Sequence, residues 1–300
     1  MKPPYLTKGD KVAIVATAKK LERNQIDGAI KEISSWGLEV MEGANLYGAH
    51  HQFAGTDAQR AADLQWALDN PEIKAVIFAR GGYGTARIID LIDWTVFKKS
   101  PKWLCGFSDL TVLHSHVQQN IGIETLHSTM PIFFKDGEKN PGSESLRKAL
   151  FGEQTAISFS QNLLNRKGST SGNLVGGNLS VIYSIMQTPS AVNYDGKILF
   201  LEDLTEYLYH LDRMMMQLKR SRQLENLRGL VVGQFTEMID NPVPFGKNAY
   251  EIIADTVSDY DFPVAFDAPI GHVDYNEAVF CGRNVKLTVD GKEEKSEIIF

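Results

Sequence analysis

The 300-residue sequence has little cysteine, no long apolar run and no extended basic run. Its two cysteines, Cys105 and Cys281, supply neither a disulfide framework nor a metal-ligand cluster, so we expect a reducing compartment and a core that needs no covalent staples. Lys and Arg number 31 against 37 Asp and Glu, which gives a formal charge of -6. Basic residues occur in runs no longer than a pair. The chain therefore lacks the basic patch that binding to nucleic acid or to an anionic membrane surface requires.

The apolar stretch nearest the N-terminus runs from Val12 to Ala16. It is too short for the hydrophobic region of a signal peptide or for a membrane span. We therefore expect a cytoplasmic protein with no membrane partner and with a small molecule or a peptide as its ligand.

Apolar runs alternate with amphipathic helical patterns through the first half of the chain. Strands are expected at 12–17, 38–41, 74–79 and 103–107, helices at 24–36, 57–68 and 110–119, and a further element at 85–91. Near-continuous apolar strands separated by helices favour a parallel sheet with helices on both faces. Ligands of such a sheet bind at the carboxyl ends of its strands.

The composition changes from about residue 136 to 171, where Lys, Glu, Asn, Gly and Ser occur with little periodicity. We interpret this change as a boundary. It gives an N-terminal α/β domain over 1–145, a linker region over 146–171 and a C-terminal domain over 172–300. Within the last, we expect strands at 198–202, 229–235 and 264–268, helices at 204–222 and 249–258, and a terminal hairpin around Asp290-Gly291.

Ser108 stands where the expected strand ending at Phe107 gives way to a helix. A serine at this junction can simply cap the helix. Alternatively, a sharp strand-to-helix turn exposes its hydroxyl beside the free N–H groups of the helix, an arrangement that suits a nucleophile and an anionic intermediate. The surrounding residues do not form the G-x-S-x-G pattern of α/β-hydrolases.

A glycine-rich loop, Arg80-Gly81-Gly82-Tyr83-Gly84, follows another strand. Its glycines permit a tight turn and close approach of the backbone, so the loop could cradle a phosphate, supply an oxyanion-hole N–H group or be an ordinary βα turn. As a dinucleotide-binding motif it is weak, because the third glycine is missing and the loop does not follow the first strand.

Glu202 and His272 also follow apolar strands. Asp203 is expected to cap the next helix, whereas the longer Glu202 can reach an imidazole. A serine hydroxyl needs an imidazole to accept its proton, and a carboxylate fixes the tautomer of that imidazole, so Ser108, Glu202 and His272 could form a catalytic triad. No histidine pair has the spacing of a zinc site with an acidic third ligand.

Five segments carry a resemblance to a known family: the loop at 80–84, the segment Gly106-Phe107-Ser108-Asp109-Leu110-Thr111, the segments at 199–203 and 211–214, and Gly271-His272. Together they resemble the LD-carboxypeptidases, which are serine peptidases and include the microcin C immunity peptidases. The ordered match extends from about residue 10 to 290. Three positions differ from the family pattern: Val273 replaces a frequent glycine, and Ser128-Thr129 replaces a frequent Gly-Pro.

The resemblance implies a flavodoxin-like parallel-sheet N-terminal domain, a smaller mixed α/β C-terminal domain and an active site between them. By the same resemblance Ser108 is the nucleophile, Glu202 and His272 complete the triad, and the N–H groups of Gly82 and Asp109 form the oxyanion hole. Arg80 and Tyr83 are candidates for substrate binding. No metal or organic cofactor is implied, and a homodimer is expected.

The expected reaction releases the terminal D-alanine of cytoplasmic murein tetrapeptides, in peptidoglycan recycling, by hydrolysis of an L,D amide bond. A second hypothesis keeps the triad but assigns peptidyl- or aminoacyl-nucleotide amides as substrates, as in the microcin C immunity peptidases. A third is a non-catalytic module that binds a small ligand at the glycine-rich loop.

Overall fold

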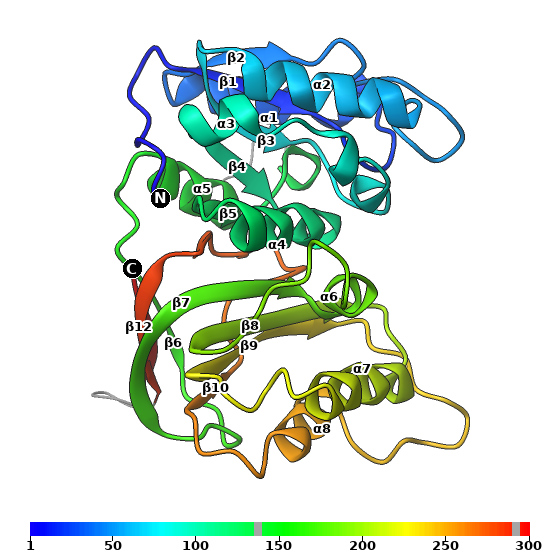
Figure 1. Ribbon diagram of the computed structural model, residues 1–300, viewed down its shortest axis with the longest axis vertical. Coiled ribbons are helices and arrows are strands. Elements are labelled where there is room, and N and C mark those ends of the chain that lie inside the picture. Colours follow the sequence, from blue (N-terminus) through cyan, green and yellow to red (C-terminus); the bar gives the residue numbers. More distant parts are fainter. Residues whose placement is uncertain (135–139, 290–294) are drawn as a thin grey trace.

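The computed structural model describes residues 1–134, 140–289 and 295–300, which form two α/β halves stacked along the long axis (Figure 1). The sheet of the first half has the order β11-β5-β4-β3-β1-β2, parallel throughout except for β11. Its strands are β1 (Lys11–Val15), β2 (Glu39–Glu42), β3 (Ile73–Phe78), β4 (Trp103–Gly106), β5 (Thr125–His127) and β11 (Val279–Cys281). The first five follow the flavodoxin-like order, as predicted.

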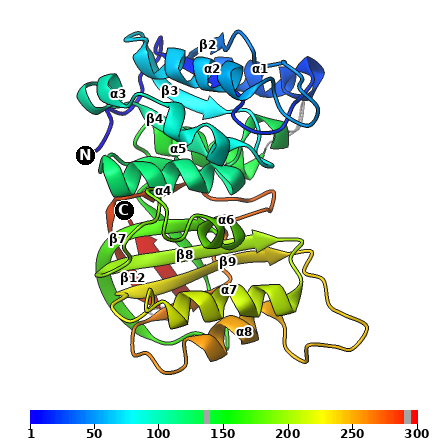
Figure 2. The same ribbon diagram turned by 45° about the vertical axis from the view of Figure 1, so that its right-hand side comes forward.

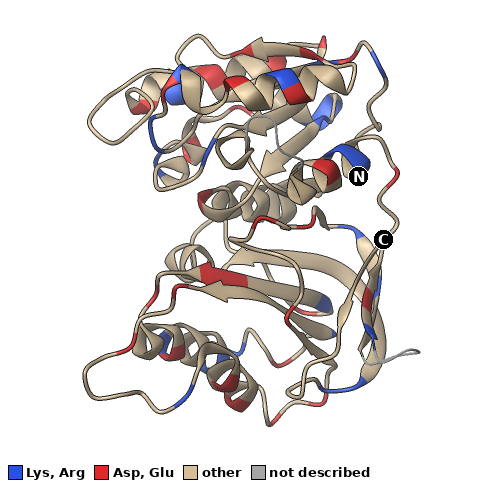
Figure 3. Cartoon of the chain, turned by 180° about the vertical axis from the view of Figure 1, so that it is seen from behind, with Lys and Arg blue, Asp and Glu red and all other residues tan. Residues whose placement is uncertain are grey.

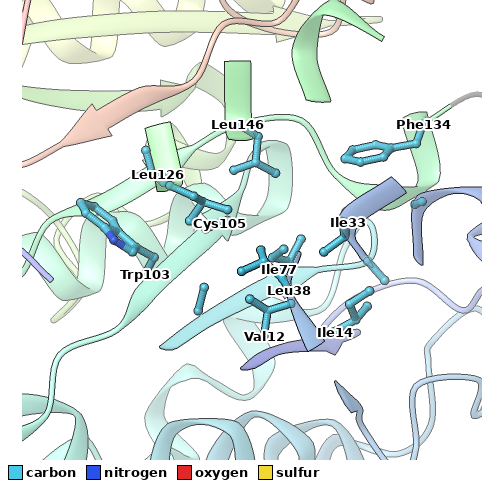
Figure 4. Close-up of a cluster of buried hydrophobic side chains, with 14 of the residues drawn as sticks. Val12, Ile14, Ile33, Leu38, Ile77, Trp103, Cys105, Leu126, Phe134 and Leu146 are labelled. Atoms are coloured by element: carbon cyan, nitrogen blue, oxygen red, sulfur yellow. The ribbon is translucent and has the colours of Figure 1, made fainter. Parts of the chain in front are cut away.

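Helices cover both faces of this sheet because its strands are apolar on both sides. The helices are α1 (Asp27–Ser35), α2 (Asp57–Asp69), α3 (Thr95–Lys99), α4 (Thr111–Asn120) and α5 (Pro141–Leu150). Val12 and Ile14 of β1 pack with residues of α1 and α5 (Figure 4), whereas Ala13 and Val15 pack with residues of α2, α3 and α4. This alternation is the period of two that a strand imposes on its side chains.

The second sheet has the order β10-β9-β8-β7-β12-β13-β6. Strands β10, β9, β8 and β7 are parallel, and the remaining pairings are antiparallel. The strands are β6 (Ala156–Ser160), β7 (Gly168–Asn178), β8 (Lys197–Leu204), β9 (Gly229–Thr236), β10 (Val264–Phe266), β12 (Asn284–Val289) and β13 (Lys295–Ile299). One face is covered by α6 (Leu179–Ser184), α7 (Leu208–Arg220) and α8 (Ala249–Thr256) (Figure 2).

Three segments differ from the expectation. Residues 85–91 form two 3₁₀ turns, η2 (Thr85–Arg87) and η3 (Ile89–Leu91). The segment 146–171 contains the end of α5, all of β6 and the start of β7. Its strands pair with β13 and β12 from the end of the chain, and such distant pairing leaves little periodicity in the local sequence.

The third difference is the helix expected from residue 204, which begins later because β8 continues to Leu204 and α7 starts at Leu208. The terminal hairpin is confirmed by the antiparallel pairing of β12 with β13. Its Asp290-Gly291 turn and residues 136–139 of the expected boundary lie outside the described residues.

Strand β11 connects the two halves: it comes after the second sheet's β10 in the chain but pairs with β5 of the first sheet. Helix α4 also packs against β7 and α6 of the second half. Acidic and basic residues are dispersed over both halves in the view of Figure 3. Among the described residues, no helix is both long enough and apolar enough to cross a bilayer.

Candidate active site

The predicted site residues lie at the carboxyl ends of strands from both sheets. The glycine-rich loop follows β3, Ser108 follows β4, Glu202 lies near the end of β8, and the loop after β10 carries His272. The rings of Phe107 and His272 are 4.6 Å apart between centroids, so the histidine of the second half lies against the residue next to the serine. The fold therefore brings the three segments together, as a site between two parallel sheets requires.

Ser108 begins the 3₁₀ turn η4 (Ser108–Leu110) with a φ of 63°. A non-glycine residue in this left-handed region is strained, and such strain is typical of a nucleophile held on a sharp strand-to-helix turn. The capping alternative is wrong, because Phe107 occupies the N-cap position and no side chain caps the turn. Among the described residues, the Ser108 hydroxyl has no hydrogen-bond partner, so it is available to a ligand.

The glycine-rich loop passes directly beside the serine. A Cβ on Gly81 would lie 3.2 Å from Ser108 Cβ and 3.3 Å from Ser108 Oγ. Only a residue without a side chain leaves this space open for a reacting group.

Two buried side chains fix that loop. The Thr85 N–H donates to Asp109 Oδ2 at 2.9 Å, and Arg60 Nη1 donates to the Gly84 carbonyl at 2.9 Å. Burial raises the pKa of the Asp109 carboxyl, against the opposing effect of its hydrogen bonds at Thr85. The side chain of Asp109 thus joins the serine turn to the loop, a role that its sequence position did not indicate.

Gly82 has a φ of 114°, which favours glycine, and a Cβ there would lie 3.0 Å from Lys19 Cβ. Within the described part of the chain, the N–H of Gly82 has no hydrogen-bond acceptor. The N–H of Asp109 lies in the first turn of η4, where the backbone provides no acceptor upstream. Neither N–H group is therefore used by another hydrogen bond among the described residues.

Glu202 and His272 form a hydrogen-bonded pair. His272 Nδ1 lies 2.7 Å from Glu202 Oε2, and the carboxylate is fully buried. Gly271 has a φ of 128°, and a Cβ there would lie 2.9 Å from Glu202 Cβ, so glycine permits this close approach. The pairing fixes a proton on Nδ1 and leaves Nε2 of His272 to act as a base.

The pair also shifts both pKa values. Burial acts to raise the pKa of Glu202, but the charge and hydrogen bonding of His272 and His127 together outweigh it and lower the pKa to about 2. Burial acts to lower the pKa of His272, but the charge and hydrogen bond of Glu202, with smaller contributions from Asp203 and Glu237, outweigh it and place the pKa above its ordinary value. The arrangement therefore favours a carboxylate that stabilises a protonated imidazole.

Asp203 does not cap α7 as predicted, because it lies within β8. Its carboxylate accepts hydrogen bonds from Asn178 Nδ2 at 2.8 Å and from the N–H groups of Ser180 at 2.8 Å and Leu204 at 2.9 Å. Burial and the neighbouring Glu202 raise the pKa of Asp203 to about 7. Asp203 thus holds the start of α6 against β8.

The site contains one residue that the sequence interpretation passed over, His127 at the end of β5. It is fully buried, and its Nε2 lies 3.8 Å from Glu202 Oε1. A polar residue at the carboxyl end of a buried parallel strand is the same signal that selected Ser108, and it could have indicated His127.

The two candidate substrate-binding residues lie on the glycine-rich loop. Arg80 is partly buried, and its Nη1 donates to the Lys20 carbonyl at 2.8 Å. Tyr83 is 53% exposed, and its ring is 6.1 Å from that of Phe53. No cluster of three or more His, Cys, Asp and Glu side chains suited to a metal ion occurs in the described ranges.

Comparison with known proteins agrees with this geometry. Residues 12–128 match the model of the LD-carboxypeptidase N-terminal domain, and residues 171–287 match that of the LD-carboxypeptidase C-terminal domain. The "Probable murein peptide carboxypeptidase" of Bacillus subtilis is 33% identical over 305 residues, which cover 99% of this chain and 94% of the relative. The murein tetrapeptide carboxypeptidase of Pseudomonas aeruginosa is 28% identical over 291 residues, 92% of each chain.

Solved structures show the same fold. The muramoyltetrapeptide carboxypeptidase from Oxalobacter formigenes aligns with a TM-score of 0.86 at 26% identity, covering 96% of this chain and 97% of the other. The microcin C7 self immunity protein MccF, in complex with aspartyl sulfamoyl adenosine, aligns with a TM-score of 0.87 at 18% identity. The alignment covers 99% of this chain and 98% of the other, and at this identity it shows a likeness of fold alone. With both domain models matched in order and a relative 33% identical over nearly its whole length, the chain belongs to the LD-carboxypeptidase family of hydrolases.

Proposed function

We propose that this protein is a serine carboxypeptidase that releases the terminal D-alanine of murein tetrapeptides in the cytoplasm. The observation that carries the proposal is the buried pair of Glu202 and His272, in which Oε2 lies 2.7 Å from Nδ1. This pair lies close to the strained turn that begins at Ser108. An activated serine needs a base of this kind, and membership of a carboxypeptidase family supplies the class of reaction. Murein peptides are the substrates named for two relatives that cover most of the chain.

In the proposed reaction, Ser108 Oγ attacks the carbonyl carbon of the L,D amide while His272 Nε2 accepts its proton. Glu202 stabilises the imidazolium that results. His272 then gives the proton to the nitrogen of D-alanine, the C–N bond breaks, and an acyl-enzyme remains on Ser108. Water, deprotonated by His272, attacks this ester, the C–O bond to Ser108 breaks as His272 returns the proton to Ser108 Oγ, and the shortened peptide is released.

The N–H groups of Gly82 and Asp109 would stabilise the oxyanion of the tetrahedral intermediates. This role requires donors held in place before the reaction, and the contacts of Asp109 and Arg60 with the loop supply that rigidity. Arg80 and Tyr83, on the same loop, would bind the substrate, with the guanidinium of Arg80 suited to its terminal carboxylate.

Replacing Gly82 with valine is expected to lower kcat by about 100 to 1,000-fold with a much smaller change in KM. A β-branched side chain disfavours the φ of 114° and meets Lys19, so the N–H would turn away from the oxyanion. Steady-state kinetics check this result. Gly122→Val is a matched control, because Gly122 also has a positive φ, of 73°, but lies at a distant turn with open space around it. An unchanged kcat in folded Gly82→Val would make the loop a plain turn.

The substrate is tested by mass spectrometry and kinetics with three compounds: a murein tetrapeptide ending in D-alanine, its L-alanine epimer and an aminoacyl-sulfamoyl adenosine. Inverting the last residue exchanges its methyl and carboxylate groups and leaves a binding partner of the carboxylate unpaired, so kcat/KM is expected to favour the D-epimer by about a thousandfold or more. Equal rates for both epimers, or a preference for the nucleotide analogue, would contradict the proposal and favour the hypothesis of nucleotide amides.

A further inference from the structure

Three buried polar atoms without a hydrogen-bond partner lie together beside the proposed triad. Within the described ranges, His127 Nδ1, His127 Nε2 and Glu202 Oε1 are inaccessible to solvent and unpaired. An unpaired buried polar group costs free energy, so native proteins rarely retain one without a reason. Here a potential donor and a charged acceptor face each other and remain just out of contact.

The separation is 3.8 Å between His127 Nε2 and Glu202 Oε1. This exceeds hydrogen-bond length by less than 1 Å, so a small movement would close it. The His127 ring lies between Phe107 and Phe200, with ring centroids at 5.6 Å and 5.1 Å, and these contacts restrict it to its present plane.

No other charged group competes for His127 among the described residues that surround it. His114 of α4 is 6.3 Å away between ring centroids, but its nitrogens already contact Thr125 Oγ1 at 2.8 Å and the Gly106 carbonyl at 2.7 Å. Burial lowers the pKa of His114 to about 3 and raises that of Cys281 on the adjacent β11, so both are neutral. The carboxylate of Glu202, on β8, is the charge that His127 faces through Oε1, and His272 bonds the other oxygen, Oε2.

We propose that His127 is a positioning residue whose Nε2–H group donates to Glu202 Oε1 during the reaction, so that two imidazoles hold the carboxylate between them. The proposal rests on the proposed function, in which Glu202 orients His272. In this tautomer the nitrogen left unpaired is Nδ1, a bare acceptor, which is more readily tolerated in a protein interior than a bare N–H. The second donor fixes the rotation of the carboxylate and draws part of its charge away from His272.

Two amide substitutions distinguish this role from simple packing. The amide nitrogen of glutamine can occupy the place of His127 Nε2, whereas that of asparagine occupies the place of Nδ1 and does not reach Glu202. Both are polar and shorter than histidine, so they perturb the core to a comparable degree. We expect His127→Gln to keep kcat within a few-fold of wild type and His127→Asn to lower it by about 10 to 100-fold, with little change in KM in either.

The pH profile provides a readout that packing would not move. Without the second donor, the full charge of Glu202 acts on His272 in the enzyme–substrate complex, so the pKa of His272 rises there and the acid limb of kcat moves to higher pH in His127→Asn but not in His127→Gln. Asp203 and Glu237, which also act to raise the pKa of His272, are the same in both variants. Equal kcat values and superimposable acid limbs for the two variants would overturn the proposal, as would a His127→Gln variant as impaired as His127→Asn.

The tautomer of His127 is measured on the unaltered protein, which keeps the proposal testable if either variant fails to fold. Long-range ¹H–¹⁵N spectra of ¹⁵N-histidine-labelled protein should show His127 with its proton on Nε2, and a proton on Nδ1 alone would contradict the assignment. This measurement requires no substrate. Absence of activity on tetrapeptides would therefore refute the proposed function separately, through the kinetics.

Discussion

Replacing Ser108 with alanine is expected to lower kcat by about four to six orders of magnitude while the fold remains intact. The alanine variant loses the only atom that could form the acyl-enzyme, and the residual rate would come from binding and from the oxyanion donors. Removing a methyl-sized hydroxyl from a partly exposed turn leaves no cavity, so the melting temperature should change little. Single-turnover kinetics on the murein tetrapeptide measure the loss.

Two controls make this prediction specific. Ser35→Ala removes an exposed hydroxyl that donates to the Glu32 carbonyl, far from the site, and should leave kcat unchanged. The double variant Ser108→Ala, His272→Ala should be no slower than Ser108→Ala by more than a few-fold, because members of a triad act as a unit. If folded Ser108→Ala retained turnover near that of wild type, the nucleophile would be another residue.

Replacing Glu202 with glutamine is expected to lower kcat by about 10,000-fold. The amide keeps the size of the side chain and can still bond His272 Nδ1, but it carries no charge to stabilise the imidazolium. Since the carboxylate raises the pKa of His272, its removal lowers that pKa. A base acts only when deprotonated, so the acid limb of kcat/KM should move to lower pH, and the pH profile of the variant measures the shift.

The neighbouring acid provides the matched control for this prediction. Asp203 is also buried on β8, but its hydrogen bonds are with Asn178 and the start of α6, and it acts on His272 through its charge alone. Asp203→Asn should therefore lower the melting temperature and should move the acid limb less than Glu202→Gln does. A Glu202→Gln variant with wild-type kcat, or with an unmoved acid limb, would show that Glu202 does not orient His272.

From the sequence, Ser108, Glu202 and His272 were selected because each stands at or after the end of an apolar run, and the structure places them after β4, near the end of β8 and in the loop after β10. The end of a strand is a local property, visible as a run of buried residues followed by a turn. The flavodoxin-like order and the glycine-rich loop beside the serine were anticipated by resemblance. The contact between the rings of Phe107 and His272 brings the loop after β10 of the second sheet to the turn after β4 of the first.

What the sequence did not reveal depends on contacts between distant segments. Asp203 was expected to cap the following helix, but β8 continues past it, and the alternation of a strand directs Glu202 and Asp203 to different partners. The strands within 146–171 gain their pairing from the last residues of the chain, so local composition resembled a linker. His127 was not predicted as a site residue, because its place beside Glu202 comes from contact between the two halves.

The pairing of β11 with β5 also affects folding and aggregation. A nascent or truncated chain that ended near residue 150 would leave one edge of β5 uncovered, and such an edge invites pairing with other chains. The segment that carries His272 lies between β10 in one sheet and β11 in the other, so unfolding of the second half withdraws both the base and the covering strand. With His272 as the proposed base, a molecule whose second half has unfolded would lose activity and expose an edge of the first sheet at the same time.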